Sequence, residues 1–365
     1  RNFLKVEIIN TMSEIHLEKG KKAIVIWLVI GIIMTVIQIL LGGITRLTGS
    51  GLSITDWKPI MGAIPPLNET EWNQAFEGYK EIGQYKTLNN HFDLSNFKFI
   101  FFWEWFHRLW GRLIGIVFIV PFIFFWKKKY FNKELTWSLI GLFILGGLQA
   151  AIGWIMVKSG LNEDDLYVSH IRLAIHFITA FLLLVYEVWF LMRLTVRDSD
   201  RIVAPKLKQF IGAIIVLLII QFAYGAFMAG LKAAPVAPTW PDINGTFIPS
   251  GVSSQSWINH PINVHVVHRS IAYIVFILIV ISTVKFLRLK NKHHIKVVSK
   301  FSYWPIVLVL IQVLLGVLSV LNAHKIVHNQ FGLYEMMAIS HQTVAILLVM
   351  ALVVQYYLLH KKQAI

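Results

Sequence analysis

Long runs of apolar residues dominate this sequence and set its fold class. Each run is about 20 residues long, the length that an α-helix needs to cross the roughly 30 Å hydrocarbon core of a bilayer. The chain of 365 residues is 56% hydrophobic, which is more apolar than an ordinary soluble domain. The pattern therefore predicts an all-α membrane protein with eight transmembrane helices, at 23–45, 103–126, 137–157, 170–192, 210–231, 265–287, 303–322 and 338–359.

Positive charge is distributed unequally between the loops. Twenty Lys and Arg lie at 19–22 before the first helix, in or beside the loops that follow even-numbered helices and in the C-terminal tail, whereas the other four loops carry eight. Because Lys and Arg gather on the cytoplasmic side of membrane proteins, both termini, including residues 1–22, are expected in the cytoplasm. The net charge of +15 is thus a signal of topology, and the lipid bilayer, not nucleic acid, is the expected partner.

The sequence contains no cysteine. This excludes disulfides, iron–sulfur clusters, thiolate-ligated heme and covalently attached c-type heme. Any metal centre must use histidine or carboxylate ligands.

The sequence repeats itself. His107-Arg108 in the second predicted helix matches His268-Arg269 in the sixth, and His176 in the fourth matches His341 in the eighth. The two matches are separated by nearly the same length of chain, which predicts an N-terminal half (23–200) and a C-terminal half (201–365), each a four-helix bundle. Because each half crosses the membrane an even number of times, an axis along the membrane normal is expected to relate the two halves.

A second motif, Gln-x-x-x-Gly, recurs in every odd-numbered predicted helix. It begins at Gln38, Gln149, Gln221 and Gln312. Plain helix packing and hydrogen bonding between helices explain it equally well. The first and third of these motifs lie further apart than the second and fourth, because the first outer loop is longer than its counterpart.

Each even-numbered predicted helix carries one histidine within about seven residues of its outer end. Ionisable side chains inside a membrane span are costly and mark functional sites by default. Two histidines on neighbouring helices of a bundle can bind an iron porphyrin from both faces. The sequence therefore predicts two heme sites, one formed by His107 and His176 and the other by His268 and His341. Structural hydrogen bonding and proton relay are the alternatives.

The two predicted sites differ in one position. Glu104 lies three residues before His107 on the same helix face, whereas His265 occupies the matching position before His268. An acid beside one site alone is typical of a catalytic half joined to an electron-transfer half, where it would move a proton or stabilise developing charge. The alternatives for Glu104 are a hydrated carboxylate at the membrane edge or a partner for Arg108. His265 either lines its site or lies hydrated at the start of a helix.

Several arginines lie near the histidines in sequence. They are candidates for pairing with the carboxylates of a porphyrin, although simple extension toward lipid headgroups explains each of them equally well. They are Arg108, Arg112, Arg172 and Arg269. The outer loops at 48–102 and 234–264 are rich in turn residues and are candidates to cover the sites, and the first is expected to contain a short surface helix near Glu69–Tyr85.

The run Glu104-Trp105-Phe106-His107-Arg108 resembles the Glu-x-x-His-Arg motif of the heme A synthase family. The outer-loop residues from Gly49 to Pro59 and the pair His341-Gln342 also resemble that family, and the resemblance extends from about residue 22 to 359. It implies an oxidoreductase of the bacterial inner membrane that oxidises the C8 methyl of heme O to the formyl group of heme A by successive hydroxylation, for cytochrome oxidase assembly.

The resemblance also implies roles for individual residues. His107 and His176 would bind the substrate heme O or product heme A, with Glu104 near the reacting methyl, while His268 and His341 would bind the heme b that passes electrons. The implied partners are an unidentified electron donor, heme O synthase and cytochrome oxidase assembly factors. Some family members carry a cysteine pair in an outer loop; this chain has none, so it cannot use a thiol there.

Two other classes of protein account for part of the pattern. A non-catalytic membrane cytochrome b that takes electrons from quinol explains the four histidines but gives Glu104 no purpose. A transporter with repeated halves explains the duplication, but it predicts polar residues near the membrane midplane. Here the polar positions gather at the outer end of the helices.

Overall fold

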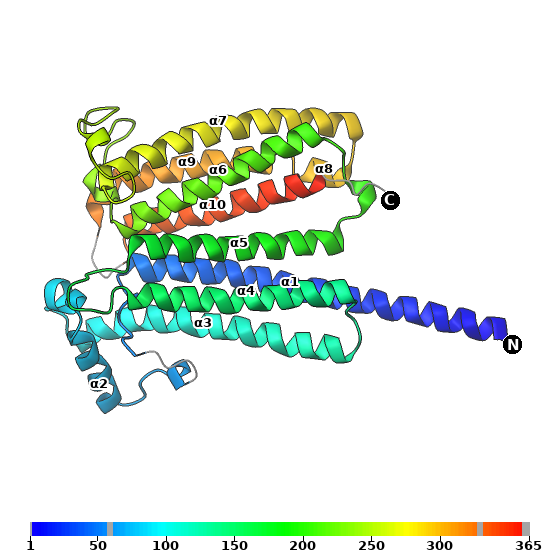
Figure 1. The fold of residues 1–365 in the computed structure, drawn as a ribbon, viewed down its shortest axis with the longest axis horizontal. Coiled ribbons are helices and arrows are strands. Elements are labelled where there is room, and N and C mark those ends of the chain that lie inside the picture. The colour runs from blue at the N-terminus through cyan, green and yellow to red at the C-terminus, as the bar shows by residue number, and fades with distance from the viewer. Residues whose placement is uncertain (1, 57–60, 327–330, 360–365) are drawn as a thin grey trace.

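The computed structural model describes residues 2–56, 61–326 and 331–359, and over these residues the chain is built from helices (Figure 1). Eight helices in this part are long and apolar enough to span a membrane, which confirms the prediction. They are α1 (Asn2–Leu47), α3 (Leu94–Lys127), α4 (Lys133–Lys158), α5 (His170–Thr195), α6 (Pro205–Gly230), α7 (Pro261–His293), α9 (Trp304–Leu321) and α10 (Leu333–Leu358). Trp57, Lys58 and Pro59 of the outer-loop motif and the basic C-terminal tail lie outside the described residues.

Helix α3 begins well before the apolar run that was predicted at 103–126. Asp93 caps it by accepting a hydrogen bond from the backbone N–H of Asn96, and Phe97 and Ile100 are fully buried in its first turns. They pack against the surface helix α2 (Glu69–Lys80), which confirms the short helix expected there. His107 therefore lies in the fourth turn of its helix. The prediction that it lies close to the helix end was wrong, because apolar length locates only the part of a helix inside the bilayer.

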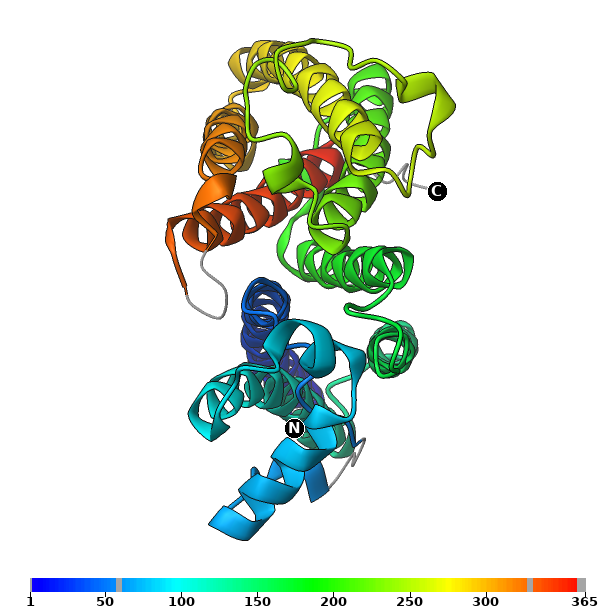
Figure 2. The same cartoon turned by 90° about the vertical axis from the view of Figure 1, so that its left-hand side faces the viewer.

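The spanning helices form two groups of four that lie side by side (Figures 1 and 2). In the first group α1 packs against α3 and α5, and α4 packs against α5; in the second, α6 packs against α7 and α10, and α9 packs against α10 and α7. This grouping of helices matches the two predicted halves. The boundary between the halves at residue 200 and the axis that relates them stay predictions. The first group is the more open one, since the backbones of α3 and α4 do not pack closely, although Phe118 of α3 stacks on Phe143 of α4.

The two halves are joined closely through α1 and α10. A Cβ added at Gly43 of α1 would lie 2.6 Å from Ile339 Cδ1, so the side chains of α10 pack directly against the α1 backbone here. On the same side of α1, the Gln342 side chain donates a hydrogen bond to the carbonyl oxygen of Ile39 (3.0 Å). Arg46, in the last turn of α1, donates to the carbonyl oxygen of Ala229 at the end of α6 (3.2 Å).

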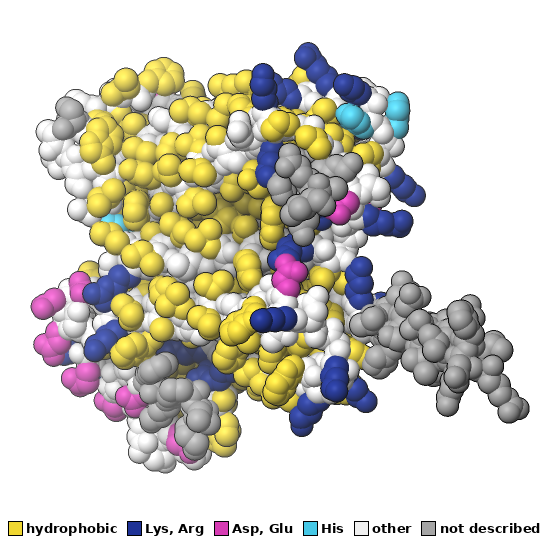
Figure 3. Space-filling model, turned by 45° about the vertical axis from the view of Figure 1, so that its right-hand side comes forward, with side chains coloured by type: hydrophobic (Ala, Val, Ile, Leu, Met, Phe, Trp, Pro, Cys, Tyr) yellow, Lys and Arg dark blue, Asp and Glu magenta, His cyan; other side chains and the backbone are white. Residues whose placement is uncertain are grey.

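The distribution of charge distinguishes the two ends of the bundle. Lys and Arg side chains gather at the end where α3 meets α4 and α5 meets α6, and acidic side chains gather mainly at the opposite end (Figure 3). A broad band of hydrophobic side chains separates them, as expected for a multi-pass membrane protein. We call the end opposite the basic loops the outer end. The location of the basic end in the cytoplasm stays a prediction.

Candidate functional site

Each of the four histidines contacts the glutamine of a Gln-x-x-x-Gly motif on the spanning helix before it. Gln38 Nε2 lies 3.0 Å from His107 Nε2 and donates to the His107 carbonyl oxygen (3.2 Å). The other three pairs are Gln149 Nε2 with His176 Nδ1 (3.1 Å), Gln221 Nε2 with His268 Nε2 (3.4 Å) and Gln312 Nε2 with His341 Nε2 (3.2 Å). Of the two interpretations of this motif, hydrogen bonding between helices is confirmed.

The glycine of each motif makes room for the same imidazole. A Cβ added at Gly316 would lie 2.9 Å from His341 Cε1, and one at Gly153 would lie 2.8 Å from His176 Cε1. The fit is looser at Gly42, 3.3 Å from His107 Nε2, and at Gly225, 3.4 Å from His268 Cε1. The motif thus brings a helix backbone against one face of each ring and a carboxamide to its edge, which fixes the ring orientation.

The histidines come together as two pairs. His107 of α3 and His176 of α5 lie close enough for a charge on one to affect the other, as do His268 of α7 and His341 of α10, so each pair joins two helices of one half. Among the described residues, no group of three or more His, Asp or Glu side chains is arranged to hold a metal ion. Two imidazoles from facing helices supply the two axial ligands that a porphyrin iron needs. The residues present therefore fit a heme in each half.

Glu104 is buried beside the first pair, with only 2% of its surface exposed. Its Oε2 accepts hydrogen bonds from Ser53 Oγ (2.8 Å) and the backbone N–H of Ile54 (2.9 Å), and its Oε1 pairs with Arg108 (2.5 Å). The interpretation as a hydrated carboxylate was wrong, because the outer loop before α2 covers the group. Its partnership with Arg108 is confirmed, and a catalytic role stays a prediction.

The matching position in the second half is held differently. His265 is fully buried, and its Nε2 lies 2.7 Å from the carbonyl oxygen of Ala233, so its interpretation as a hydrated helix start was wrong. Arg269 donates to the carbonyl oxygens of Asp242 (2.7 Å) and Ala237 (3.0 Å). Arg108 likewise donates to the carbonyl oxygen of Ile54 (3.1 Å). In both halves the arginine after the histidine fastens an outer loop over the site, but only the first half adds a carboxylate.

The remaining arginines have less specific positions. Arg172 is exposed and donates to the carbonyl oxygen of Ile155 in the last turn of α4 (3.1 Å). Arg112 lies one turn after Arg108 on α3. A role for either in binding porphyrin carboxylates stays a prediction. Near the junction of the two halves, burial and the positive charge of Arg46 lower the pKa of Lys232 to about 8.

One intramembrane acid was not predicted as a site residue. Glu187 lies on α5, and its Oε1 accepts a hydrogen bond from Thr35 Oγ1 of α1 (3.0 Å). A lone carboxylate within the apolar run 170–192 is itself a signal of function, because such groups are costly in lipid. The glutamine partners of the histidines were recognised as a repeat, but sequence spacing alone does not say which histidine each one contacts.

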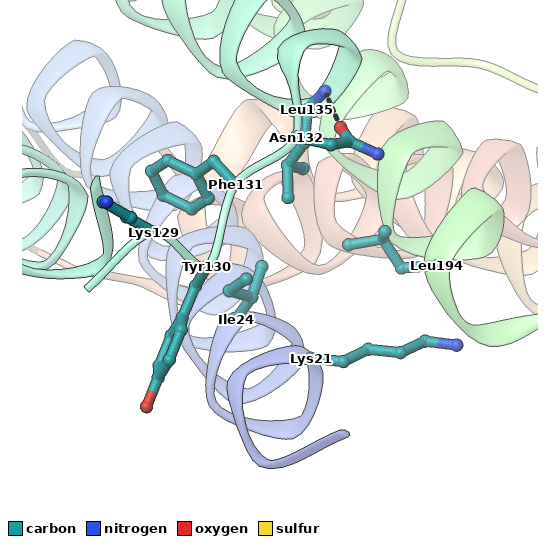
Figure 4. Close-up of a pocket in the computed structure, with 8 residues that line it drawn as sticks. All are labelled: Lys21, Ile24, Lys129, Tyr130, Phe131, Asn132, Leu135 and Leu194. Atoms are coloured by element: carbon teal, nitrogen blue, oxygen red, sulfur yellow. Dashed lines mark hydrogen bonds between the residues drawn. The ribbon is translucent and has the colours of Figure 1, made fainter. Parts of the chain in front are cut away.

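A pocket of about 320 Å³ lies at the other end of the first half (Figure 4). It is lined by residues at the start of α1, at the connection from α3 to α4 and at the end of α5, among them Lys21, Tyr130 and Leu194. His176, near the start of α5, is at the opposite end of that helix from Leu194. This pocket is therefore separate from the candidate site.

Comparison with known proteins gives consistent results. A family model described as cytochrome oxidase assembly protein matches residues 25–353. A heme A synthase from Bartonella henselae is 40% identical over 311 residues, which cover 84% of this chain and 86% of that protein. Another from Flavobacterium psychrophilum is 38% identical over 353 residues, 94% of this chain and 99% of that protein. The family match includes all four paired histidines and Glu104.

Proposed function

Because this chain belongs to the cytochrome oxidase assembly family that includes these heme A synthases, we propose that it is itself a heme A synthase, an oxidoreductase that converts heme O to heme A. The observation that carries the proposal is the buried Glu104 carboxylate beside the His107–His176 pair, with no acid at the matching position of the other half. Two similar sites, of which only the first has this acid, are what we expect of a substrate site beside an electron-transfer site.

The N-terminal half is the proposed substrate site. His107 and His176 would hold heme O through its iron, with Glu104 as the acid nearest the reacting C8 methyl group. Two successive hydroxylations of that carbon, each consuming dioxygen and two electrons from the donor and releasing water, followed by loss of water from the resulting diol, would give the formyl group of heme A. Hydrogen bonds from Ser53 and Ile54 hold this carboxylate in one orientation, from which it could accept a proton or stabilise positive charge near the reacting carbon.

The C-terminal half is the proposed site of heme b, held by His268 and His341. When bound, heme b supplies one-electron transfer between the donor and the substrate site. The protein's own contribution is orientation: Gln221 and Gln312 direct the two imidazoles, and Arg269 closes the outer loop over them. His265 takes the position that Glu104 holds in the N-terminal half.

The membrane orientation follows from the charges. We place the basic end of the bundle in the cytoplasm and both sites toward the outer face of a bacterial inner membrane. Heme O is lipophilic and reaches the sites from the bilayer. The electron donor, heme O synthase and cytochrome oxidase assembly factors remain the proposed partners.

Heme analysis of the purified protein tests this proposal. Pigments are extracted and separated by chromatography before and after incubation with heme O and a reductant in air. Heme b together with heme A, or with a hydroxylated intermediate, is the expected result. Retention of heme b with no conversion of heme O would instead support the electron-carrying cytochrome b.

A further inference from the structure

Three glycines of the N-terminal half border open space on the cytoplasmic side of its histidine pair. Gly31 on α1, Gly115 on α3 and Gly146 on α4 would each accept a Cβ with no other atom within 4 Å. Gly31 lies seven residues before Gln38, which contacts His107. Residues spaced by seven or eight share one helix face.

The other two glycines are placed in the same way. Gly115 lies eight residues after His107, and Gly146 lies seven residues before Gly153, whose backbone faces His176. At 1.5 Å per residue, all three glycines are about 10–12 Å deeper in the membrane than the residues that mark the site. Three helices thus leave space at one depth beneath the same site.

The C-terminal half has no such space at the matching positions. When the two halves are aligned on the repeated glutamines and histidines, the positions of Gly31, Gly115 and Gly146 are taken by Ile214, Phe276 and Val309. Ile214 and Val309 are buried in the hydrophobic core, and Phe276 packs against it. Large side chains in the C-terminal half therefore occupy the space that glycines leave open in the N-terminal half.

A polar pair also lies on the cytoplasmic side of the histidines. Thr35, one turn from Gln38 and one turn from Gly31, donates to Glu187 Oε1. Glu187 Oε2 is shielded from solvent and has no hydrogen-bond partner among the described residues. The same alignment places Leu218 and Leu352, both buried in the core, at these positions of the C-terminal half.

We propose that the Thr35–Glu187 pair and the glycine-lined space form a subsite for the hydroxylated isoprenoid side chain of heme O, and so select heme O over heme b for the N-terminal half. This inference rests on the proposed function. Heme O differs from heme b by a hydroxyl-bearing isoprenoid chain on the porphyrin edge opposite the two carboxylates. If the porphyrin carboxylates lie toward the outer arginines, this edge would point to the cytoplasmic side of the histidines, where Thr35 and Glu187 lie.

The chemistry of the subsite matches both parts of that side chain. The unpaired Oε2 of Glu187 accepts a hydrogen bond from the substrate hydroxyl, because a carboxyl oxygen left without a partner in an apolar interior is strongly unfavourable. The hydrocarbon chain then extends into the space between Gly31, Gly115 and Gly146. A heme without the chain would leave that space unfilled and Oε2 unpaired.

Two substitutions that copy the C-terminal half test the subsite. Gly146→Val introduces the side chain of Val309, and Glu187→Leu introduces that of Leu352. Affinities for heme O and heme b are measured by titration of the purified protein, with extracted heme b as a check on the C-terminal half. We expect Gly146→Val to weaken heme O binding at least tenfold, and Glu187→Leu to reduce the preference for heme O over heme b about tenfold.

The chain offers a matched control for each substitution. Gly147→Val adds the same side chain to the neighbouring residue, which is exposed and also has no atom within 4 Å, so heme O binding should not change. Glu187→Gln keeps a hydrogen-bonding oxygen and should retain most of the preference. Unchanged affinity for heme O in both Gly146→Val and Glu187→Leu would overturn the inference.

The outcomes separate this inference from the proposed function. If the wild-type protein does not convert heme O to heme A, the proposed function fails. If the wild type converts heme O and both copying variants bind and convert it equally well, only the subsite fails. If Gly146→Val also loses heme b, Gly115→Leu on another helix gives the same test of the space.

Discussion

The glycine that faces each histidine provides a graded test of the sites. In the C-terminal half, Gly316→Ala would place a Cβ 2.9 Å from His341 Cε1, whereas Gly225→Ala would place one 3.4 Å from His268 Cε1. The first distance is shorter than atoms tolerate, so the ring or the helix must move; the second is ordinary van der Waals contact. The same substitution should therefore have opposite effects at two positions that serve the same proposed heme.

The size of the difference follows from two opposing terms. Replacing a glycine inside a helix by alanine stabilises the helix by about 1 kcal/mol, and both variants gain this. Overpacking a well-packed site costs about 1–3 kcal/mol, and only Gly316→Ala incurs it. Since about 1.4 kcal/mol is a factor of ten in an equilibrium constant, Gly316→Ala should weaken heme b binding roughly tenfold or more. Gly225→Ala should bind heme b normally and melt at an equal or higher temperature.

Heme transfer measures this difference directly. Each purified variant is mixed with an excess of a heme-free acceptor protein, and loss of heme b is followed by absorbance, while circular dichroism gives the melting temperature. Faster heme loss from Gly316→Ala alone is the expected result. Equal heme loss from both variants, or faster loss from Gly225→Ala, would refute the idea that these glycines act by making room for the imidazoles.

Other residues of the two sites give separate predictions. Glu104→Ala should keep the heme b absorbance but abolish or arrest heme A formation, and an unchanged heme A yield on chromatography would exclude its catalytic role. Ser53→Ala removes one of the hydrogen bonds that hold that carboxylate and should slow heme A formation about tenfold without changing bound heme b; a normal rate would show that the bond is dispensable. His268→Ala or His341→Ala should lower retained heme b, whereas His107→Ala should chiefly lower heme O or heme A; equal loss of every heme in all three would indicate unfolding.

Hydropathy alone was enough to predict the spanning helices, because lipid requires about 20 apolar residues for each crossing. It failed at the start of α3, where Phe97 and Ile100 are buried against α2 outside the bilayer. Nothing in the local pattern separates aromatic residues that face lipid from those that face another helix. The helix boundary therefore depended on a tertiary contact.

The sequence was enough to predict which residues form the candidate site, but not which contacts they make. The paired histidines and Glu104 follow from charge cost and repetition, yet the burial of Glu104 depends on a loop whose path the sequence does not give. Glu187 was missed because its partner Thr35 lies far away in the chain, on another helix. The repeat was most informative where the two halves differ. A glycine in one half indicates open space only when the aligned position of the other half is seen to hold a large residue such as phenylalanine.

The close approach of α1 and α10 at Gly43 bears on how such a duplicated architecture can work. Carriers built from repeated halves rock one half against the other. Here rocking would break the hydrogen bond from Gln342 to Ile39 and open the contact between Gly43 and Ile339. A rigid junction instead keeps the spacing between the two histidine pairs constant. Electron tunnelling slows steeply with distance, so the proposed transfer between two hemes would depend on a junction that holds the two halves at a constant separation.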